Sequence, residues 1–464
     1  MPSRPAVVDD VLELIGRTPL LRLRRVAAEV PFELFGKLEF LNPGGSVKDR
    51  IGPSMVERAE RDGLLKPGGT LVEATSGNTG IGLALCAAVK GYRLVAVLPD
   101  KMSTEKIRLL RALGARVVIT PSQVPPEDPR SNYSVARRIA RETPGAFYPN
   151  QYENPANPEA HYRTTGPEIL EALPGRLDAV VATIGTGGTV SGLGRYFRER
   201  SPSTKVIAVD PEGSVLAGFA RTGKVGEAVP YKLEGIGEDM IPRTVDYSVI
   251  DEFVTVGDRE SFLMARRLAR EEGLFVGGSS GAAVVGALRW AARASLPPAA
   301  RVVALLPDSG DRYLSTFYSE EWMRENRFLD EAASAGTLLA AKAFQPALVS
   351  LEPATPVREA LTTLRERNVA QAPVLSAGRN VGSVTEEELL RSVLQDSTAL
   401  ERSVGRYLSP PFLEIDAATP LSDILRHLKE DRALLVRGPA GFEGILTRQD
   451  LLRFFTRNEE DHAI

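Results

Sequence analysis

Residues 70–98 read TLVEATSGNTGIGLALCAAVKGYRLVAVL and contain one strand–helix–strand unit. The apolar run that begins this stretch leads into a helical segment ending at Gly91, a residue suited to the position after a helix C-terminus. Residues 93–98 then form a short apolar run that is typical of a buried strand. The stretch therefore predicts the repeating unit of α/β proteins.

The same alternation of apolar runs and helical segments continues along the chain to about residue 330. Ser103 is a candidate N-cap for a helix that ends near Gly114, and another helix is expected around residues 134–142. Further strands are predicted at residues 116–120, 177–184, 205–209 and 301–306. This order predicts a largely parallel sheet covered on both faces, with ligands at the carboxyl ends of its strands.

Length and composition indicate an ordinary globular protein with more than one domain. A chain of 464 residues is too long for a single core, so two or three domains are expected. Charged residues make up 25% and the net charge is −3, so neither nucleic acid nor a membrane is an expected partner. Residues 1–10 lack the apolar core of a signal peptide, and the apolar run at 282–292 is too short to cross a bilayer.

The few cysteines and histidines exclude several kinds of chemistry. Cys86 is the single cysteine, so an intrachain disulfide is excluded and a reducing, cytoplasmic location is expected. It lies in an apolar run, which favours a buried thiol over a nucleophile. His161, His427 and His462 are scattered without the spacing of metal ligands, so no metal site is expected. For His161 a structural role is favoured over substrate contact.

The character of the sequence changes after residue 327. Residues 330–337 are small and polar, which predicts a linker. Beyond it, GSVTEEELL from Gly382 matches GILTRQDLL from Gly444, 62 residues later, which predicts two copies of one small α/β module. The expected domains are a first domain at 1–330, a linker at 331–341 and a module pair at 342–464, divided into 342–400 and 401–464.

The segment NPGGSVKDR at residues 42–50 surrounds a candidate catalytic lysine, Lys48. The glycines allow a tight turn, and Ser46 can cap a helix that carries Lys48 in its first turn. The positive end of the helix dipole there lowers the pKa of the amine and favours its reaction with an aldehyde. Pro53 should kink or restart the helix. Alone, this pattern is more simply a surface lysine at a helix start.

Three further clusters combine glycines with hydroxyl side chains at predicted helix N-termini. EATSGNTG at 73–80 can bind a carboxylate or phosphate, and GTGGT at 185–189, before a helix expected from about Ser191, can close its backbone on an anion. GGSSG at 277–281 lies at another predicted strand–helix junction. Each cluster alone also fits an ordinary capped turn. With the lysine, and without a magnesium carboxylate, they predict a pyridoxal phosphate (PLP) site.

These clusters, in this order, resemble the PLP-dependent enzymes of the tryptophan-synthase-β fold family. The similarity extends from IGRTPL at residues 15–20 to the repeat, and is strongest to the branch of cystathionine β-synthases and O-acetylserine sulfhydrylases. It implies fold type II, with two open, mostly parallel α/β subdomains in a PLP-dependent catalytic domain, followed by a tandem CBS-domain pair. It also implies a homodimer or larger homo-oligomer.

The resemblance implies specific roles for site residues. Lys48 carries the cofactor as a Schiff base, Asn78 bonds the cofactor's 3′-oxygen, and Ser279 faces the pyridine nitrogen. The phosphate loop comprises Gly185, Thr186, Gly187, Gly188 and Thr189. The substrate-binding residues are Thr75, Ser76, Thr79, Gln151, Tyr152, Gly235 and Gly237.

Within this branch, the residues favour a lyase that condenses L-serine with L-homocysteine in transsulfuration and cysteine biosynthesis. Tyr152 after Gln151, and EGIGED at residues 234–239, resemble this type rather than the sulfhydrylases. The alternative is a cysteine synthase that uses O-acetylserine and sulfide. A more distant one is a non-catalytic scaffold whose modules sense nucleotides. No haem is expected, because the residues before Ile15 include neither cysteine nor histidine.

The module pair is a candidate site for S-adenosylmethionine or an adenine nucleotide. In modules of this kind a Gly-x-x-Thr-x-x-Asp run offers a hydroxyl and a carboxylate to a ribose. The second copy fits with Thr447 and Asp450, whereas the first has Glu388 at the aspartate position. A purely structural or dimerising role for the pair remains the alternative.

Overall fold

The computed structural model describes residues 7–294, 296–329, 334–340, 342, 348–439 and 441–460. The chain divides into two compact units, residues 1–329 and 330–464. Among the described residues, no helix is long and apolar enough to span a bilayer.

The larger sheet of the first unit has six strands in the order β1-β2-β10-β7-β8-β9. The strands are β1 (Leu20–Arg22), β2 (Glu33–Leu38), β10 (Arg301–Leu306), β7 (Ala179–Thr183), β8 (Lys205–Pro211) and β9 (Glu252–Val256). All neighbours are parallel except β1 and β2. The sheet is therefore largely parallel, as the strand–helix alternation predicts.

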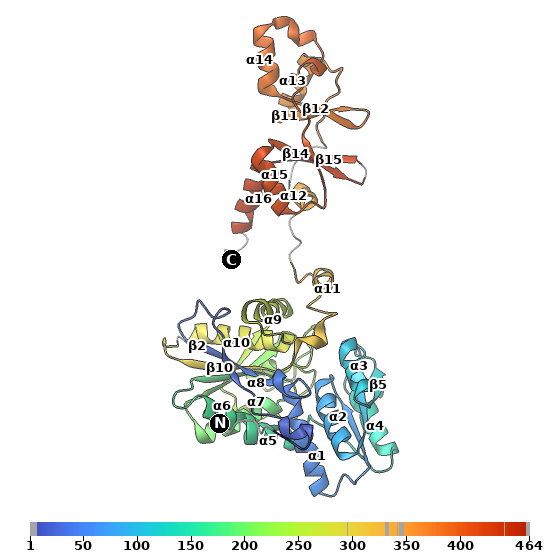
Figure 1. The fold of residues 1–464 in the computed structure, drawn as a ribbon, viewed down its shortest axis with the longest axis vertical. Helices are drawn as coiled ribbons and strands as arrows, with labels where there is room; N and C mark the ends of the chain where they lie inside the picture. Colours follow the sequence, from blue (N-terminus) through green and yellow to red (C-terminus); the bar gives the residue numbers. More distant parts are fainter. Residues whose placement is uncertain are drawn as a thin grey trace. The chain divides into compact units, whose positions relative to one another are not determined.

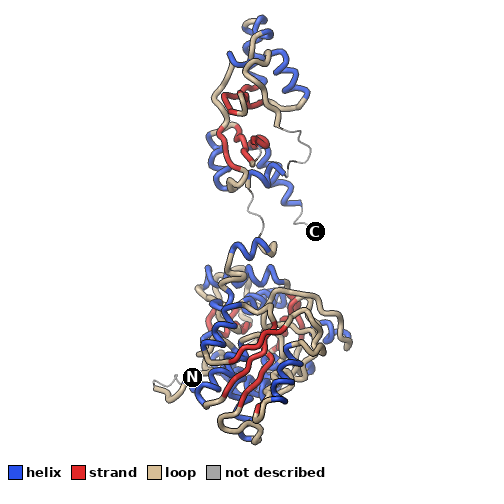
Figure 2. Tube along the Cα trace, turned by 90° about the vertical axis from the view of Figure 1, so that its right-hand side faces the viewer, coloured by secondary structure: helices blue, strands red, loops and turns tan. Residues whose placement is uncertain are grey.

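Helices cover both faces of this sheet (Figures 1 and 2). Because side chains alternate along a strand, Val181 and Val209 face one helix layer, whereas Val180 and Ala208 face the other. The first layer is formed by α9 (Asp258–Glu272) and α10 (Gly278–Ala294). The second layer contains α6 (Gly166–Ala172), α7 (Gly188–Arg200) and α8 (Leu216–Thr222).

The smaller sheet of the first unit is fully parallel, in the order β5-β4-β3-β6. Its strands are β3 (Thr70–Ala74), β4 (Arg93–Pro99), β5 (Arg116–Thr120) and β6 (Ala146–Phe147). Its helices are α1 (Ile51–Arg61), α2 (Asn78–Lys90), α3 (Thr104–Ala112) and α4 (Asn132–Glu142). Cys86 is buried in the core of this subdomain, where burial raises the pKa of its thiol to about 12, as expected for a core residue.

Three details differ from the sequence prediction. Ser103 occupies the N-cap position of α3, but its side chain makes no capping hydrogen bond. Helix α7 begins at Gly188 rather than near Ser191, because Gly187 takes a left-handed conformation (φ 83°) and ends the loop earlier. Residues 277–281 follow an isolated bridge at Val276, not a strand.

The second unit contains the two repeated modules. The first has α13 (Val357–Glu366), β11 (Gln371–Ser376), β12 (Arg379–Thr385) and α14 (Glu386–Gln395). The second has β13 (Leu413–Asp416), α15 (Leu421–Glu430), β14 (Ala433–Gly438), β15 (Gly441–Thr447) and α16 (Arg448–Glu460). The matching sequence runs thus form the same strand–helix step, β12–α14 and β15–α16.

Segments that belong to the two module cores alternate along the chain. The structure therefore differs from the expected linker at 331–341 and from the expected division at residue 400. Helix α12 (Ala335–Ala340) lies inside the expected linker, yet buries Leu338 in the core of the second module. Conversely, Val404 packs in the core of the first module and its N–H donates to Thr355 O at 2.8 Å. Leu338 and Val404 are apolar, which explains why their segments pack into module cores instead of only connecting domains. Residues 331–333 and 341 of the expected linker lie outside the described residues.

Candidate active site

A cavity in the first unit lies where strands of both sheets end. It opens beyond the carboxyl ends of β7 and β10, as expected for ligands of parallel sheets. The predicted cofactor and substrate residues that line it are Lys48, Asn78, Gly185, Thr186, Gly187, Thr189, Gly235 and Ser279. The predicted residues that are not part of its lining are Thr75, Ser76, Thr79, Gln151, Tyr152, Gly188 and Gly237.

Lys48 lies in a short 3₁₀ turn, Val47–Asp49, rather than in an α-helix. Ser46 caps this turn by accepting a hydrogen bond from the backbone N–H of Lys48 at 3.3 Å. Helix α1 begins at Ile51, in agreement with the restart expected near Pro53. Burial lowers the pKa of the Lys48 amine, although the negative charges of Glu238 and Asp308 act in the opposite direction. A larger fraction of this amine is therefore neutral than for an exposed lysine.

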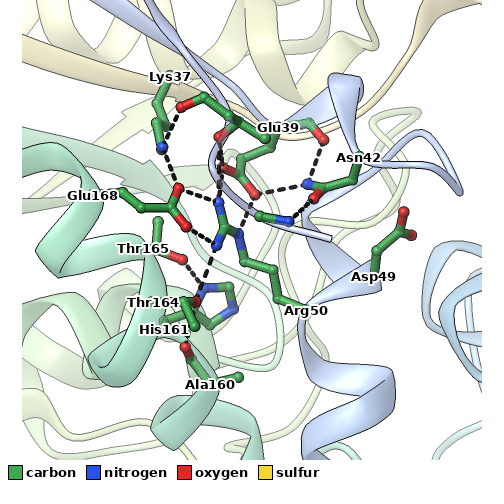
Figure 3. Close-up of polar contacts among 12 residues, drawn as sticks. Lys37, Glu39, Asn42, Asp49, Arg50, Ala160, His161, Thr164, Thr165 and Glu168 are labelled. Carbon is green, nitrogen blue, oxygen red and sulfur yellow. Dashed lines mark hydrogen bonds and ion pairs between the residues drawn. The ribbon is translucent and has the colours of Figure 1, made fainter. Parts of the chain in front are cut away.

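A buried ion-pair cluster supports the turn (Figure 3). The Arg50 guanidinium contacts Glu39 Oε2 at 2.6 Å and Glu168 Oε1 at 2.8 Å, and Lys37 Nζ contacts Glu168 Oε2 at 2.6 Å. Burial alone would raise the pKa of Glu39, but the Arg50 charge lowers it to about 2. No role was predicted for Arg50, whose partner Glu168 lies 118 residues away along the chain.

His161 connects this region to the phosphate loop. Its Nε2 lies 3.2 Å from Thr189 Oγ1 and its Nδ1 lies 2.9 Å from Thr165 Oγ1. Burial, followed by the Arg50 charge, lowers the pKa of His161 to about 3, so the ring is neutral at physiological pH. The residue is buried as a structural histidine would be, and it also orients a threonine of the cavity.

Asp308 joins the two side chains expected to contact the cofactor ring. Its carboxylate accepts hydrogen bonds from Asn78 Nδ2 at 2.8 Å and from Ser279 Oγ at 3.4 Å. Tyr313 Oη donates to the same carboxylate at 2.6 Å, and the Arg312 guanidinium donates to Asn78 Oδ1. Asp308 was not predicted as a site residue, although its position just after strand β10 (Arg301–Leu306) was a usable signal.

The residues predicted to bind substrate lie at and near the N-terminus of α2 (Asn78–Lys90). Thr79 Oγ1 donates to Gln151 Oε1 at 2.6 Å, and Gln151 Nε2 donates to Ala74 O at 3.0 Å. A Cβ atom on Gly235 would lie 3.8 Å from Ser76 Oγ, so these two segments face each other. The structure thus brings the predicted substrate residues of the two subdomains together, whereas Gly237 packs behind them against Pro211.

The residues present fit pyridoxal phosphate. Lys48 provides an amine for the aldehyde, and Ser279 provides a hydroxyl on the same cavity. Thr186, Thr189 and the N-terminus of α7 provide hydroxyl and backbone donors for a phosphate. At Gly188 an added Cβ would lie only 1.8 Å from Asn157 Oδ1, so a glycine is required for this close approach.

The predicted nucleotide residues lie in the second unit. Asp450 Oδ2 accepts hydrogen bonds from Thr447 Oγ1 at 2.7 Å and from its backbone N–H at 2.8 Å. Lys342 Nζ also contacts Asp450 Oδ2 at 2.8 Å. Glu388 Oε1 of the first module lies 3.4 Å from Nη1 of Arg432, a residue of the second module. Each candidate carboxylate therefore already has a cation beside it.

Family models match both units of the chain. Residues 11–308 match the family described as "Pyridoxal-phosphate dependent enzyme", and residues 341–395 and 404–457 match the CBS domain. These matches agree with the expected fold type II domain and C-terminal CBS pair.

Curated relatives and solved structures give the same result. Cystathionine beta-synthase of Mus musculus is 42% identical over 93% of this chain and 78% of its own length. The Dictyostelium discoideum protein of that name is 37% identical over 98% of this chain and 93% of its own length. O-ureido-L-serine synthase superposes with a TM-score of 0.63 at 40% identity, covering 70% of this chain and 98% of that chain. The O-acetylserine dependent cystathionine beta-synthase from Helicobacter pylori superposes with a TM-score of 0.61 at 41% identity. The match covers 67% of this chain and 99% of that chain. The chain therefore belongs to the family of pyridoxal-phosphate dependent enzymes that catalyse β-replacement, in the group of the cystathionine beta-synthases with paired CBS domains.

Proposed function

We propose that this enzyme condenses L-serine with L-homocysteine to give cystathionine and water. The observation that carries the proposal is the buried Lys48 amine on a cavity that Asn78 and Ser279 also line, beside the α2 N-terminus. The names of the relatives support the same reaction, because proteins 37–42% identical to this chain are called cystathionine beta-synthase.

PLP, when bound, supplies an aldehyde that joins amines and a ring that draws electrons from the α-carbon. In our proposal the Lys48 amine attaches the cofactor, accepts the α-proton after the substrate amine has replaced it, and later returns a proton. Asn78 and Ser279 orient the ring, and the N-terminus of α7 binds the phosphate. Thr79 and Gln151, held together by their hydrogen bond, bind the substrate carboxylate.

The first test compares substrate pairs. We expect kcat/KM for serine with homocysteine to exceed that for O-acetylserine with sulfide by about 10-fold or more, since differential transition-state binding sets specificity. Mass spectrometry of the products distinguishes cystathionine from cysteine. Cysteine as the sole product, formed from O-acetylserine and sulfide, would contradict the proposal.

A second candidate uses O-acetylserine in place of serine. The specific observation is the 41% identity to a solved enzyme whose title calls it O-acetylserine dependent. Assaying homocysteine with each of the two first substrates separates this candidate from the serine-dependent one.

We also propose a cytoplasmic homo-oligomer. The single, buried cysteine supports a reducing compartment, and the resemblance to fold type II enzymes supports a dimer or larger assembly. Sedimentation of the purified full-length chain would test the oligomeric state.

For the CBS pair we propose an adenosine-type ligand at Thr447 and Asp450. Calorimetry with S-adenosylmethionine and ATP should detect binding to the wild type, with affinity lowered about 10-fold or more in Asp450→Ala. Lys342→Met should tighten binding, because the Lys342 ammonium contacts the same carboxylate oxygen. Asp423→Ala, which changes a partly exposed aspartate of the same module, is the control. The absence of heat with either ligand would leave a structural role.

A further inference from the structure

Glu238 lies in a loop whose backbone is fixed on both sides. Its N–H donates to Ser214 Oγ at 3.1 Å, and its carbonyl accepts the N–H of Val215 at 3.0 Å. The neighbouring Gly237 has φ 72° and donates to Ile184 O at 2.7 Å. Because a Cβ at Gly237 would come within 2.4 Å of Pro211, the turn that aims the Glu238 side chain needs a glycine.

The Glu238 carboxylate lies beside Gly185, a residue of the cavity lining. Its Oε1 lies 3.5 Å from where a Cβ on Gly185 would stand, and Gly185 lines the cavity. Its Oε2 accepts a hydrogen bond from Tyr133 Oη at 3.4 Å. The charges of Glu238 and Lys48 each act on the pKa of the other, which places this carboxylate within electrostatic reach of the reacting amine.

The other carboxylates of this region already have strong partners. Glu234, which lines the cavity, pairs with Lys106 Nζ at 2.7 Å, and Asp308 accepts the hydrogen bonds from Asn78, Ser279 and Tyr313. Within the described part of the chain, Glu238 forms no ion pair. Burial and then the Asp239 charge raise its pKa to about 8, although Lys101 and Lys48 oppose this effect. A cation brought beside Glu238 would therefore be stabilised.

We propose that Glu238 binds the α-ammonium group of the second substrate, an amino acid that carries a thiol. This inference rests on the proposed function and adds how the thiol substrate is selected. The first substrate does not supply this cation in the proposed function. Its amine replaces the Lys48 amine on the cofactor, and its carboxylate is bound by Thr79 and Gln151. An ammonium–carboxylate contact at a partly buried site selects amino thiols over sulfide and over thiols that lack an amine.

The test uses the full-length holoenzyme, saturating serine and two thiols. Homocysteine and 4-mercaptobutyrate have the same chain, thiol and carboxylate, and differ only in the α-ammonium group. Glu238→Gln should raise KM for homocysteine about 10- to 100-fold, as expected for the loss of a charged hydrogen bond. KM for 4-mercaptobutyrate should change less than about 2-fold. Asp239→Asn, which neutralises the adjacent exposed carboxylate, should leave both values near those of the wild type.

Two further measurements keep the outcomes distinct. The absorbance change of the bound cofactor on adding serine alone should persist in Glu238→Gln, which shows that the site is folded and the first substrate binds. Glu238→Asp, which keeps the charge, should retain most of the preference for homocysteine. Equal KM changes for both thiols, or a slower response to serine with unchanged thiol KM, would overturn the proposal. Wild-type turnover of serine with homocysteine reports on the proposed function separately.

Discussion

Lys48→Ala is expected to lower turnover by about 1,000-fold or more, the largest effect of any substitution proposed for the catalytic unit. Lys48 provides the sole lysine amine among the described residues that line the cavity, so no neighbouring group can replace it in proton transfer. Its burial lowers the amine pKa, which makes it a better base near neutral pH than an exposed lysine. Loss of the amine should also abolish covalent attachment of the cofactor.

The measurement combines steady-state turnover with borohydride reduction, digestion and mass spectrometry of the peptides. In the wild type the pyridoxyl group should lie on the peptide that contains Lys48, and in Lys48→Ala it should be absent. Lys66→Ala is the control, because Lys66 is exposed and outside the cavity. A pyridoxyl group found on another peptide of the wild type would remove the basis of the assignment.

Arg50→Met is expected to destabilise the catalytic unit by about 3–5 kcal/mol, because it leaves the buried Glu39 carboxylate without its cation. The Glu39 side chain is fully buried and forms its ion pair with Arg50, whereas Glu168, which is 14% exposed, also pairs with Lys37. Thermal or urea unfolding of the full chain measures the loss. Arg58→Met is the matched control, because the Arg58–Asp62 pair is about half exposed and should contribute less than about 1 kcal/mol. Equal losses in both variants would contradict this account.

The same cluster predicts a pH dependence. The pKa of Glu39 is lowered to about 2 in the folded protein from an ordinary value of 4.5. Its stabilising contribution is therefore complete above pH 4.5 and is lost as the pH falls toward 2. In Arg50→Met, burial would instead raise this pKa, so the variant should lose less stability over that interval. Unfolding measured at several pH values in the interval tests the difference.

The sequence predicted features that depend on short-range patterns. The cap by Ser46, the helix end at Gly91 and the repeated strand–helix step follow from local residue types and were found in the structure. The prediction that the glycine-rich segments lie close together also followed from the sequence. In a parallel sheet the carboxyl ends of the strands meet at the same edge.

Features that depend on distant partners were not predictable in this way. Arg50 and Glu168 are 118 residues apart, and nothing in either local sequence indicates the other. Glu238 belongs to the EGIGED motif, which indicated only the branch of the family, and Asp308 was not predicted as a site residue. The positions of both carboxylates result from tertiary packing. The expected module boundaries differ from the structure for a related reason, because the segment 331–341 was expected only to connect domains and instead contributes Leu338 to a core.

The exchange of segments between the CBS copies determines where the chain can be shortened. Helix α12 precedes both copies but packs with the second, and the residues around Val404 follow the first copy's helices but complete its core. An enzyme truncated after residue 341 keeps α12 while losing the side chains of the second module that pack with Leu338. Truncation after Leu329 avoids that exposed apolar helix and follows the natural limit of the catalytic unit.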